Sequence, residues 1–380
     1  MMILVDNLPS ILIFIIIIFG FLWVFYPAWA VLIAERLEWD VEQLSSPKTQ
    51  HTELPILSLV IPAYNEEERI PIMIRESFNY LASQKGKDVL RRLQSCAKTK
   101  PTTSFESKRS DGIRQKGQNQ SERSEPTVEW LVVNDGSKDS TCETVREIYN
   151  NLMGITNGAG AIGDNATSVG WNWQIVSLRR NGGKGAAVKT GMNLASGMFH
   201  LMVDADGATD FENGLEKLTQ ELERFSCSDN CKSDVDPTIA VFGSRAHLQN
   251  ESSAKRSFVR TILMKSFHFF VSLLVSSKVH DTQCGFKIFS KSASSVVFKT
   301  LHLRRWAFDT EIVLVSELHG IKMVEVAVPW KEVDGSKLST SKLALAVVSI
   351  SMLRDMVCVR ACYMLGIWRI KAGQCLRKNN

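Results

Sequence analysis

Short apolar runs alternate with segments of helical periodicity along most of the chain. The runs lie at 57–61, 130–133, 173–178, 199–203 and 239–243. Trp130–Val133 is apolar without interruption, which is typical of a strand buried on both faces of a sheet. After the first run, Ile70, Ile74 and Phe78 recur at helical spacing and predict a helix over 70–83. This repeated alternation predicts an α/β domain that has a mostly parallel sheet with helices on both faces.

Residues 8–34 form an almost uncharged apolar run that is long enough to cross a bilayer as a helix. A cleaved signal peptide is the alternative, because Ala28-Trp29-Ala30 resembles a small-x-small cleavage site. Two observations argue against a signal peptide. The only charged residue before the run is Asp6, whereas a signal peptide carries basic residues there, and the apolar run continues past the cleavage site through 31–34. We therefore predict one uncleaved transmembrane anchor over 8–34, with the rest of the chain on the cytosolic side, where Lys and Arg are enriched.

Two later apolar segments are interrupted by charges. Lys255–Val275 contains four Lys and Arg residues and is interpreted as an interfacial helix, with a buried core helix as the alternative. Residues 342–380 are interpreted as helices that lie on the membrane. The predicted organisation is an anchor at 8–34, an α/β domain at 55–341 and membrane-interfacial helices at 342–380.

The formal net charge of +5 does not belong to the predicted fold. Residues 85–125 hold eleven Lys/Arg against five Asp/Glu, which leaves the remainder of the chain close to neutral. We therefore predict no nucleic-acid partner. The segment 84–127 is predicted to be a disordered basic insertion, either solvated or lying against anionic lipid headgroups. The eight cysteines show neither a disulfide framework nor complete zinc spacing.

Polar and glycine-rich loops follow four successive predicted strands. They are Pro62–Glu66, Asn134–Ser137, Asn181–Lys184 and Asp204–Asp206. In parallel sheets, ligands bind beyond the carboxyl ends of the strands. Asp204 and Asp206 are two residues apart, so their carboxylates can point the same way and share one hard cation such as Mg²⁺ or Mn²⁺. A pair of solvated acids at a strand end is the alternative.

A nucleotide sugar would use each of these loops. Asp206, supported by Asp204, would hold a metal against the leaving diphosphate. Asp135 would accept the ring N–H of the base. The donor-binding residues proposed for the other loops are Pro62, Tyr64 for stacking, Glu66 for ribose hydroxyls and Lys184 for a phosphate.

Seven segments together carry a family resemblance: IPAYNEEERI, LVVNDGSKDST, RNGGKGAAVKTGM, VDADGATD, GSRAHL, DTQCGFKIF and RWAFDTEIV. The set resembles the inverting family 2 glycosyltransferases of the GT-A fold, from about residue 57 to the C-terminus. Within that family it is similar to the enzymes that glucosylate dolichyl phosphate. The resemblance implies transfer of glucose from UDP-glucose to dolichyl phosphate on the cytosolic face of the endoplasmic reticulum membrane, with Mg²⁺ or Mn²⁺.

The chain departs from the family pattern at three places. The segments 84–127 and 227–237 are insertions that we do not associate with the family. His302 stands where processive members carry the Gln of a Gln-x-x-Arg-Trp motif, which argues against a polymer synthase. Gly207 and Ala208 follow the acid pair where related mannosyl enzymes carry a leucine and a polar metal-holding residue, so water is the expected substitute.

The acceptor side needs a cationic cradle rather than a general base. A phosphomonoester has a second pKa near ~6, so it is already largely ionised at neutral pH. The candidate phosphate-binding residues are Arg245, Arg256, Arg260 and Lys287, because arginine can grip phosphate through two hydrogen bonds. The resemblance supports Arg245 and one of the other two arginines. Asp309 stands where other members place a base. It is a candidate for orienting the acceptor, or else a helix N-terminal acid.

Two other functions stay open from the sequence. One is the same machinery with a different donor, such as a dolichyl-phosphate mannosyltransferase or another polyprenyl-phosphate glycosyltransferase. The other is a non-catalytic membrane protein that binds nucleotide sugars. Because the domain is predicted to be cytosolic, we expect the sequons at Asn165 and Asn250 to carry no glycan.

Overall fold

A computed structural model describes residues 8–33, 37–44, 54–97, 126–157, 169–226, 238–245, 269–333 and 342–369. Its centre is an eight-stranded sheet of order β1-β4-β3-β2-β5-β7-β6-β8. The strands are β1 Trp39–Gln43, β2 Leu57–Ala63, β3 Thr127–Asn134, β4 Gly170–Leu178, β5 Phe199–Met202, β6 Ile239–Ser244, β7 Lys287–Ser290 and β8 Lys322–Ala327. The helices are α2 Leu8–Val24, α3 Tyr26–Ile33, α4 Ile70–Ala82, α5 Gln84–Ala97, α6 Thr141–Asn157, α7 Lys184–Leu194, α8 Phe211–Ser226, α11 Lys291–Thr300, α12 Phe308–Leu318 and α13 Lys342–Met364.

The sheet is mixed rather than mostly parallel. Strands β4, β3, β2 and β5 run parallel as predicted, and β8 is parallel to β6. Strand β7 lies antiparallel between β5 and β6, and β1 is antiparallel to β4 at the edge. With only four residues, β7 is too short to give a periodic signal in the sequence.

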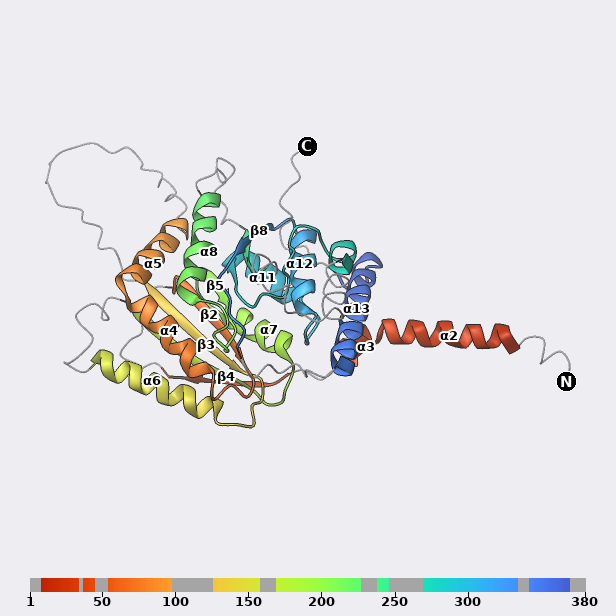
Figure 1. Cartoon of the computed structure of the whole chain (residues 1–380), viewed down its shortest axis with the longest axis horizontal. Helices are drawn as coiled ribbons and strands as arrows, with labels where there is room; N and C mark the ends of the chain where they lie inside the picture. The colour runs from red at the N-terminus through yellow and green to blue at the C-terminus, as the bar shows by residue number, and fades with distance from the viewer. Residues whose placement is uncertain are drawn as a thin grey trace, which may run out of the picture.

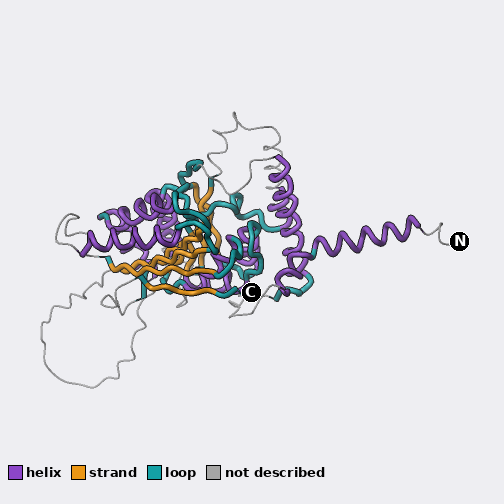
Figure 2. Tube along the Cα trace, turned by 90° about the horizontal axis from the view of Figure 1, so that it is seen from below, coloured by secondary structure: helices purple, strands orange, loops and turns teal. Residues whose placement is uncertain are grey.

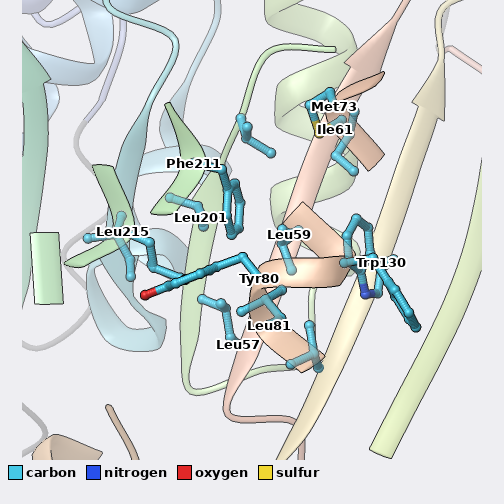
Figure 3. Close-up of a cluster of buried hydrophobic side chains, with 14 of the residues drawn as sticks. Leu57, Leu59, Ile61, Met73, Tyr80, Leu81, Trp130, Leu201, Phe211 and Leu215 are labelled. Carbon is cyan, nitrogen blue, oxygen red and sulfur yellow. The ribbon is translucent and has the colours of Figure 1, made fainter. Parts of the chain in front are cut away.

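Helices cover both faces of the sheet, as predicted (Figures 1 and 2). One core lies beneath α4, α5, α6 and α8, and the other beneath α7, α11, α12 and α13. In the first core Trp130 and Trp173 stack with ring centroids 4.3 Å apart. Figure 3 shows Tyr80 and Phe211 reaching the same core from α4 and α8.

The predicted disorder of segment 84–127 is wrong over its first third. Helix α5 spans Gln84–Ala97 and buries Leu90 and Leu93 completely. Arg92 pairs with Glu216 at 2.7 Å and with Glu223 at 2.6 Å, both on α8. Three of the basic residues that suggested a solvated loop, Lys85, Arg91 and Arg92, thus lie on the outer face of an amphipathic helix, whereas Lys87 is buried. Residues 98–125 lie outside the described part of the chain, as do the sequons and the loop 227–237.

The predicted anchor is a bent pair of helices. Among the described residues, no single helix combines the length and the apolar composition needed to cross a bilayer, whereas Ile16–Val24 and Tyr26–Ile33, bent by 55°, do so together. Phe25 and Ala28 are buried in the core that includes α13, while α2 extends away from the body (Figure 1). The described residues of the C-terminal region, 342–369, contain one long helix, α13.

Candidate active site

The loops after β2 and β3 are hydrogen-bonded to each other at the edge of the sheet where the parallel strands end. Asn65 adopts a left-handed backbone conformation, with φ of 54°, and its backbone N–H donates to Ser137 Oγ at 3.0 Å. Lys138 N–H donates to Asn65 Oδ1 at 2.8 Å. Asparagine tolerates positive φ better than most residues, which explains its place at this turn. The sequence prediction that these loops share one edge of the sheet is confirmed.

Asp135 shapes the glycine-rich loop. Its Oδ1 accepts the N–H of Gly182 at 2.6 Å, and its Oδ2 accepts the N–H of Gly183 at 2.9 Å. Burial raises the pKa of Asp135 to about 6, against the opposing effect of the two backbone N–H groups and of Arg305. The predicted contact with a nucleobase has to use the remaining acceptor capacity of this carboxylate.

Asp204 is paired with Lys184, which is the first residue of α7. Asp204 Oδ1 and Lys184 Nζ are 2.7 Å apart. Burial disfavours both charges, yet their attraction raises the pKa of Lys184 and lowers that of Asp204. A Cβ at Gly285 would lie only 2.0 Å from Asp204 Oδ2, so the glycine in DTQCGF makes room for this carboxylate. No pattern in the sequence links Gly285 to Asp204.

Asp206 is half-buried, and its Oδ1 accepts the Ala208 N–H at 3.0 Å. Gly207 between them has φ of +66°, which accounts for a glycine after the acid pair. No group of three or more His, Cys, Asp or Glu side chains in the described ranges is placed to hold a metal ion. The acid pair therefore fits a hard cation only if phosphate or water oxygens complete its coordination, as is usual for Mg²⁺.

Arg245 is fixed by Asp281, which the sequence analysis had not singled out. Arg245 Nε and Nη2 each donate to this carboxylate at 2.8 Å, as does the Arg245 backbone N–H. The Trp330 ring lies beneath the guanidinium, 5.4 Å from Cζ to the centroid. Glu325 accepts the backbone N–H groups of His280 and Asp281, so strand β8 holds the Asp281 segment in place.

Asp309 and Lys287 form a buried pair behind the acid pair. Lys287 Nζ donates to Asp309 Oδ1 at 2.6 Å and to Cys284 O at 2.5 Å. Lys287 is 0% exposed. Burial raises the pKa of Asp309 despite Lys287 and Lys184. The predicted contact of Lys287 with an acceptor phosphate would require this pair to open.

The remaining predicted site residues are those of the loop after β2 and two arginines proposed for the acceptor phosphate. The Glu66 carboxylate accepts hydrogen bonds from both Nε and Nη2 of Arg69, at 2.8 and 2.6 Å. A ribose hydroxyl would therefore have to bond to a carboxylate that is already paired. Tyr64 is half-buried in the loop after β2, and Pro62 is half-buried within that strand. Arg256 and Arg260 lie outside the described residues.

Comparison with known proteins relates the chain to one family. Residues 115–298 match the model of glycosyl transferase family 2. The chain is 35% identical to a dolichyl-phosphate beta-glucosyltransferase of Dictyostelium discoideum, covering 91% of this chain and 88% of that one. It is 34% identical to the Homo sapiens protein of the same name, covering 83% and 78%.

Among solved structures, the chain resembles glucosyl-3-phosphoglycerate synthase from Mycobacterium tuberculosis, in complex with Mn²⁺ and UDP-glucose. The TM-score is 0.41 at 14% identity, covering 81% of this chain and 79% of that one. The extent and identity of the sequence matches settle the family: this chain belongs to glycosyltransferase family 2 and, within it, to the dolichyl-phosphate beta-glucosyltransferases.

Proposed function

We propose that this chain transfers glucose from UDP-glucose to dolichyl phosphate with inversion, giving dolichyl β-D-glucosyl phosphate for protein N-glycosylation. The observation that carries the proposal is the 35% identity to a dolichyl-phosphate beta-glucosyltransferase over 91% of the chain. The carboxyl edge of the sheet supports it chemically, because it combines a half-buried acid pair for a metal–diphosphate with a fixed arginine for a second phosphate.

The donor would lie across the glycine-rich loop and the acid pair. Asp206 and Asp204 would hold Mg²⁺ or Mn²⁺, which neutralises the charge that develops on the leaving diphosphate when it is bound. Lys184 begins α7, where backbone N–H groups and the helix dipole favour an anion. Its ammonium would pair with a donor phosphate as Asp204 takes up the cation. Asp135 would keep Gly182 and Gly183 in place beneath the donor.

The acceptor phosphate would supply its own nucleophile. One of its oxygens bonds to the anomeric carbon while the bond from that carbon to the UDP oxygen breaks, and UDP leaves with the electron pair. Because the phosphomonoester is ionised, no side chain has to remove a proton.

Arg245 is the cation best placed to receive this phosphate. Asp281 occupies Nε and Nη2, which orients the guanidinium and leaves Nη1 for the ligand. Arg256 and Arg260 are further candidates. Asp309 is already paired with Lys287, so we assign it to orienting this wall of the site rather than to general-base catalysis.

We place the protein in the endoplasmic reticulum membrane with its catalytic domain in the cytosol. The bent pair α2–α3 would be the single-pass anchor, and α13 would lie at the interface. Exposed apolar residues on α13, including Val347 and Ile350, support contact with lipid.

A donor-by-acceptor assay on the purified full chain tests the activity. We expect glucose transfer from UDP-glucose to dolichyl phosphate, loss of transfer with a chelator, and recovery with Mg²⁺ or Mn²⁺. Asp206→Asn is expected to lower kcat by about 100-fold or more. Asp210→Asn is the matched control, since the Asp210 carboxylate is exposed and accepts hydrogen bonds from Asn213 at the start of α8.

Three outcomes would contradict the assignment. Transfer from GDP-mannose but not from UDP-glucose would replace the donor. Full activity of Asp206→Asn would remove the metal role. Binding of UDP-glucose without any transfer would favour the non-catalytic alternative.

A further inference from the structure

Glu311 is a buried carboxylate that the proposed chemistry does not use. It lies in the first turn of α12 and is 0% exposed. Its oxygens accept the His302 N–H at 3.0 Å and the Leu303 N–H at 2.6 Å. His302 Nδ1 and Tyr363 Oη each lie 3.0 Å from Oε1. Glu311 therefore joins two segments, the 301–307 loop and the C-terminal end of α13.

The 301–307 loop sits directly on the glycine-rich loop. Arg304 O accepts the Ala186 N–H at 3.1 Å. A Cβ at Gly183 would lie 2.6 Å from Arg304 O, and one at Gly185 would lie 2.8 Å from Leu303 O. These contacts leave no room for the glycine-rich loop to shift unless the 301–307 loop shifts with it.

The end of α13 and the segment that follows it reach the same loop through aromatic contacts. The Tyr363 ring of α13 lies 6.0 Å from His302, centroid to centroid, and the Trp368 ring beyond the helix stacks on His302 with centroids 4.1 Å apart and planes 3° apart. Near its middle, α13 packs on the N-terminal helices, where Arg354 lies over the rings of Trp23 and Tyr26 at 5.6 and 5.3 Å. A continuous set of contacts thus runs from the apolar helices to the glycine-rich loop.

We propose that Glu311 and Tyr363 are positioning residues. They couple the packing of α13 against the 301–307 loop to the conformation of the glycine-rich loop, and hence to the affinity for the donor. Neither residue touches the proposed donor or acceptor. Their effect passes through the 301–307 loop, whose carbonyl groups meet Gly183 and Gly185. The link to donor affinity rests on the proposed function, whereas the link to loop mobility does not.

Tyr363→Phe removes only the hydroxyl that bonds Glu311 and keeps the ring beside Trp368. We expect faster hydrogen–deuterium exchange in residues 181–187 of the ligand-free full chain in detergent. We also expect the dissociation constant of UDP-glucose and its KM to rise about three- to tenfold, with kcat nearly unchanged. Tyr80→Phe, on the opposite face of the sheet, is the matched control and should change neither quantity.

Glu311→Gln provides a second variant for the same contact. If the two residues act as one unit, the double variant should bind UDP-glucose no more weakly than Glu311→Gln alone. Unchanged exchange at 181–187 in Tyr363→Phe, or a change equal to that in Tyr80→Phe, would overturn the proposal. Failure of wild-type glucose transfer would instead refute the proposed function, because the exchange measurement needs no substrate.

Discussion

At the scale of single residues, the acid that holds the glycine-rich loop makes donor binding depend on pH. The ionised Asp135 carboxylate can accept two backbone N–H groups, whereas its protonated form places a hydroxyl against one of them. Since burial raises its pKa to about 6, affinity for UDP-glucose should increase as the pH rises from 5 to 7. Binding rather than turnover is the quantity to measure, because the acceptor phosphate also titrates near ~6 and UDP-glucose carries only diester phosphates.

The same group acts on stability with the opposite sign. Its pKa is higher in the folded state, about 6 against an ordinary 3.8, so the native protein binds this proton more tightly than the unfolded chain does. The resulting stabilisation is complete below about 4 and is lost as the pH rises to about 6. Asp135→Asn should abolish both pH steps. An unchanged binding profile in this variant would refute the assignment.

Gly285 tests how tightly Asp204 is held. In Gly285→Ala the new methyl group would overlap the Asp204 carboxylate and force it away from its position beside Lys184. A displacement of about 1 Å at a reacting site typically costs 10- to 100-fold, so we expect kcat to fall by about that factor. Gly154→Ala, where a Cβ meets nothing within 4 Å, is the control and should retain activity. Equal activity of the two variants would show that Asp204 can move freely.

The sequence predicted the acids of this site better than their partners. Asp135, Asp204 and Asp206 follow strands that are evident as apolar runs, and the ends of parallel strands meet at one edge. Asp281 and Glu311 do not follow such a run. Their roles depend on strand β8, whose Glu325 holds the Asp281 segment, and on the packing of α13. Both partners come from distant parts of the chain and leave no local pattern.

At the scale of elements, the same contrast separates α4 from α5. The helix predicted over 70–83 agrees with α4, Ile70–Ala82, because its large apolar residues recur at helical spacing. Helix α5 was assigned to a disordered insertion because its charges outnumber its large apolar residues. Its few apolar side chains fall on one face, and acidic residues of α8 neutralise the basic face.

Removing a core side chain from α5 should therefore destabilise the domain without affecting chemistry. Leu93 is 0% exposed, and Leu93→Ala should lower the free energy of unfolding by about 2–5 kcal/mol. Thermal unfolding in detergent measures the change, and kcat below the transition should stay at the wild-type value. The control is Arg91→Ala, since this half-exposed residue pairs only with Asp88 and should cost about 0.5 kcal/mol at most. Equal midpoints for the two variants would mean that α5 is not docked.

At the scale of the whole molecule, the N-terminal helices have two separable roles. Helix α2 extends away from the body, whereas Phe25 and Ala28 are buried in the core that contains α13 (Figure 1). Removing residues 1–22 would take away most of α2 but leave Trp23 beside Arg354, and removing 1–34 would also remove Phe25 from the core. Both truncations should release the protein from carbonate-washed membranes, because neither keeps enough apolar length to cross a bilayer.

Only the longer truncation should lower the melting temperature. Burial of a phenylalanine contributes about 2–3 kcal/mol, which corresponds to a shift of about 3–5 °C in a domain of this size. If coupling through α13 operates, the longer truncation should also weaken UDP-glucose binding in detergent, whereas the shorter one should not. Equal melting temperatures and equal affinities for the two truncations would reduce the N-terminal pair to a simple anchor. A difference in both would make α3 part of the catalytic domain.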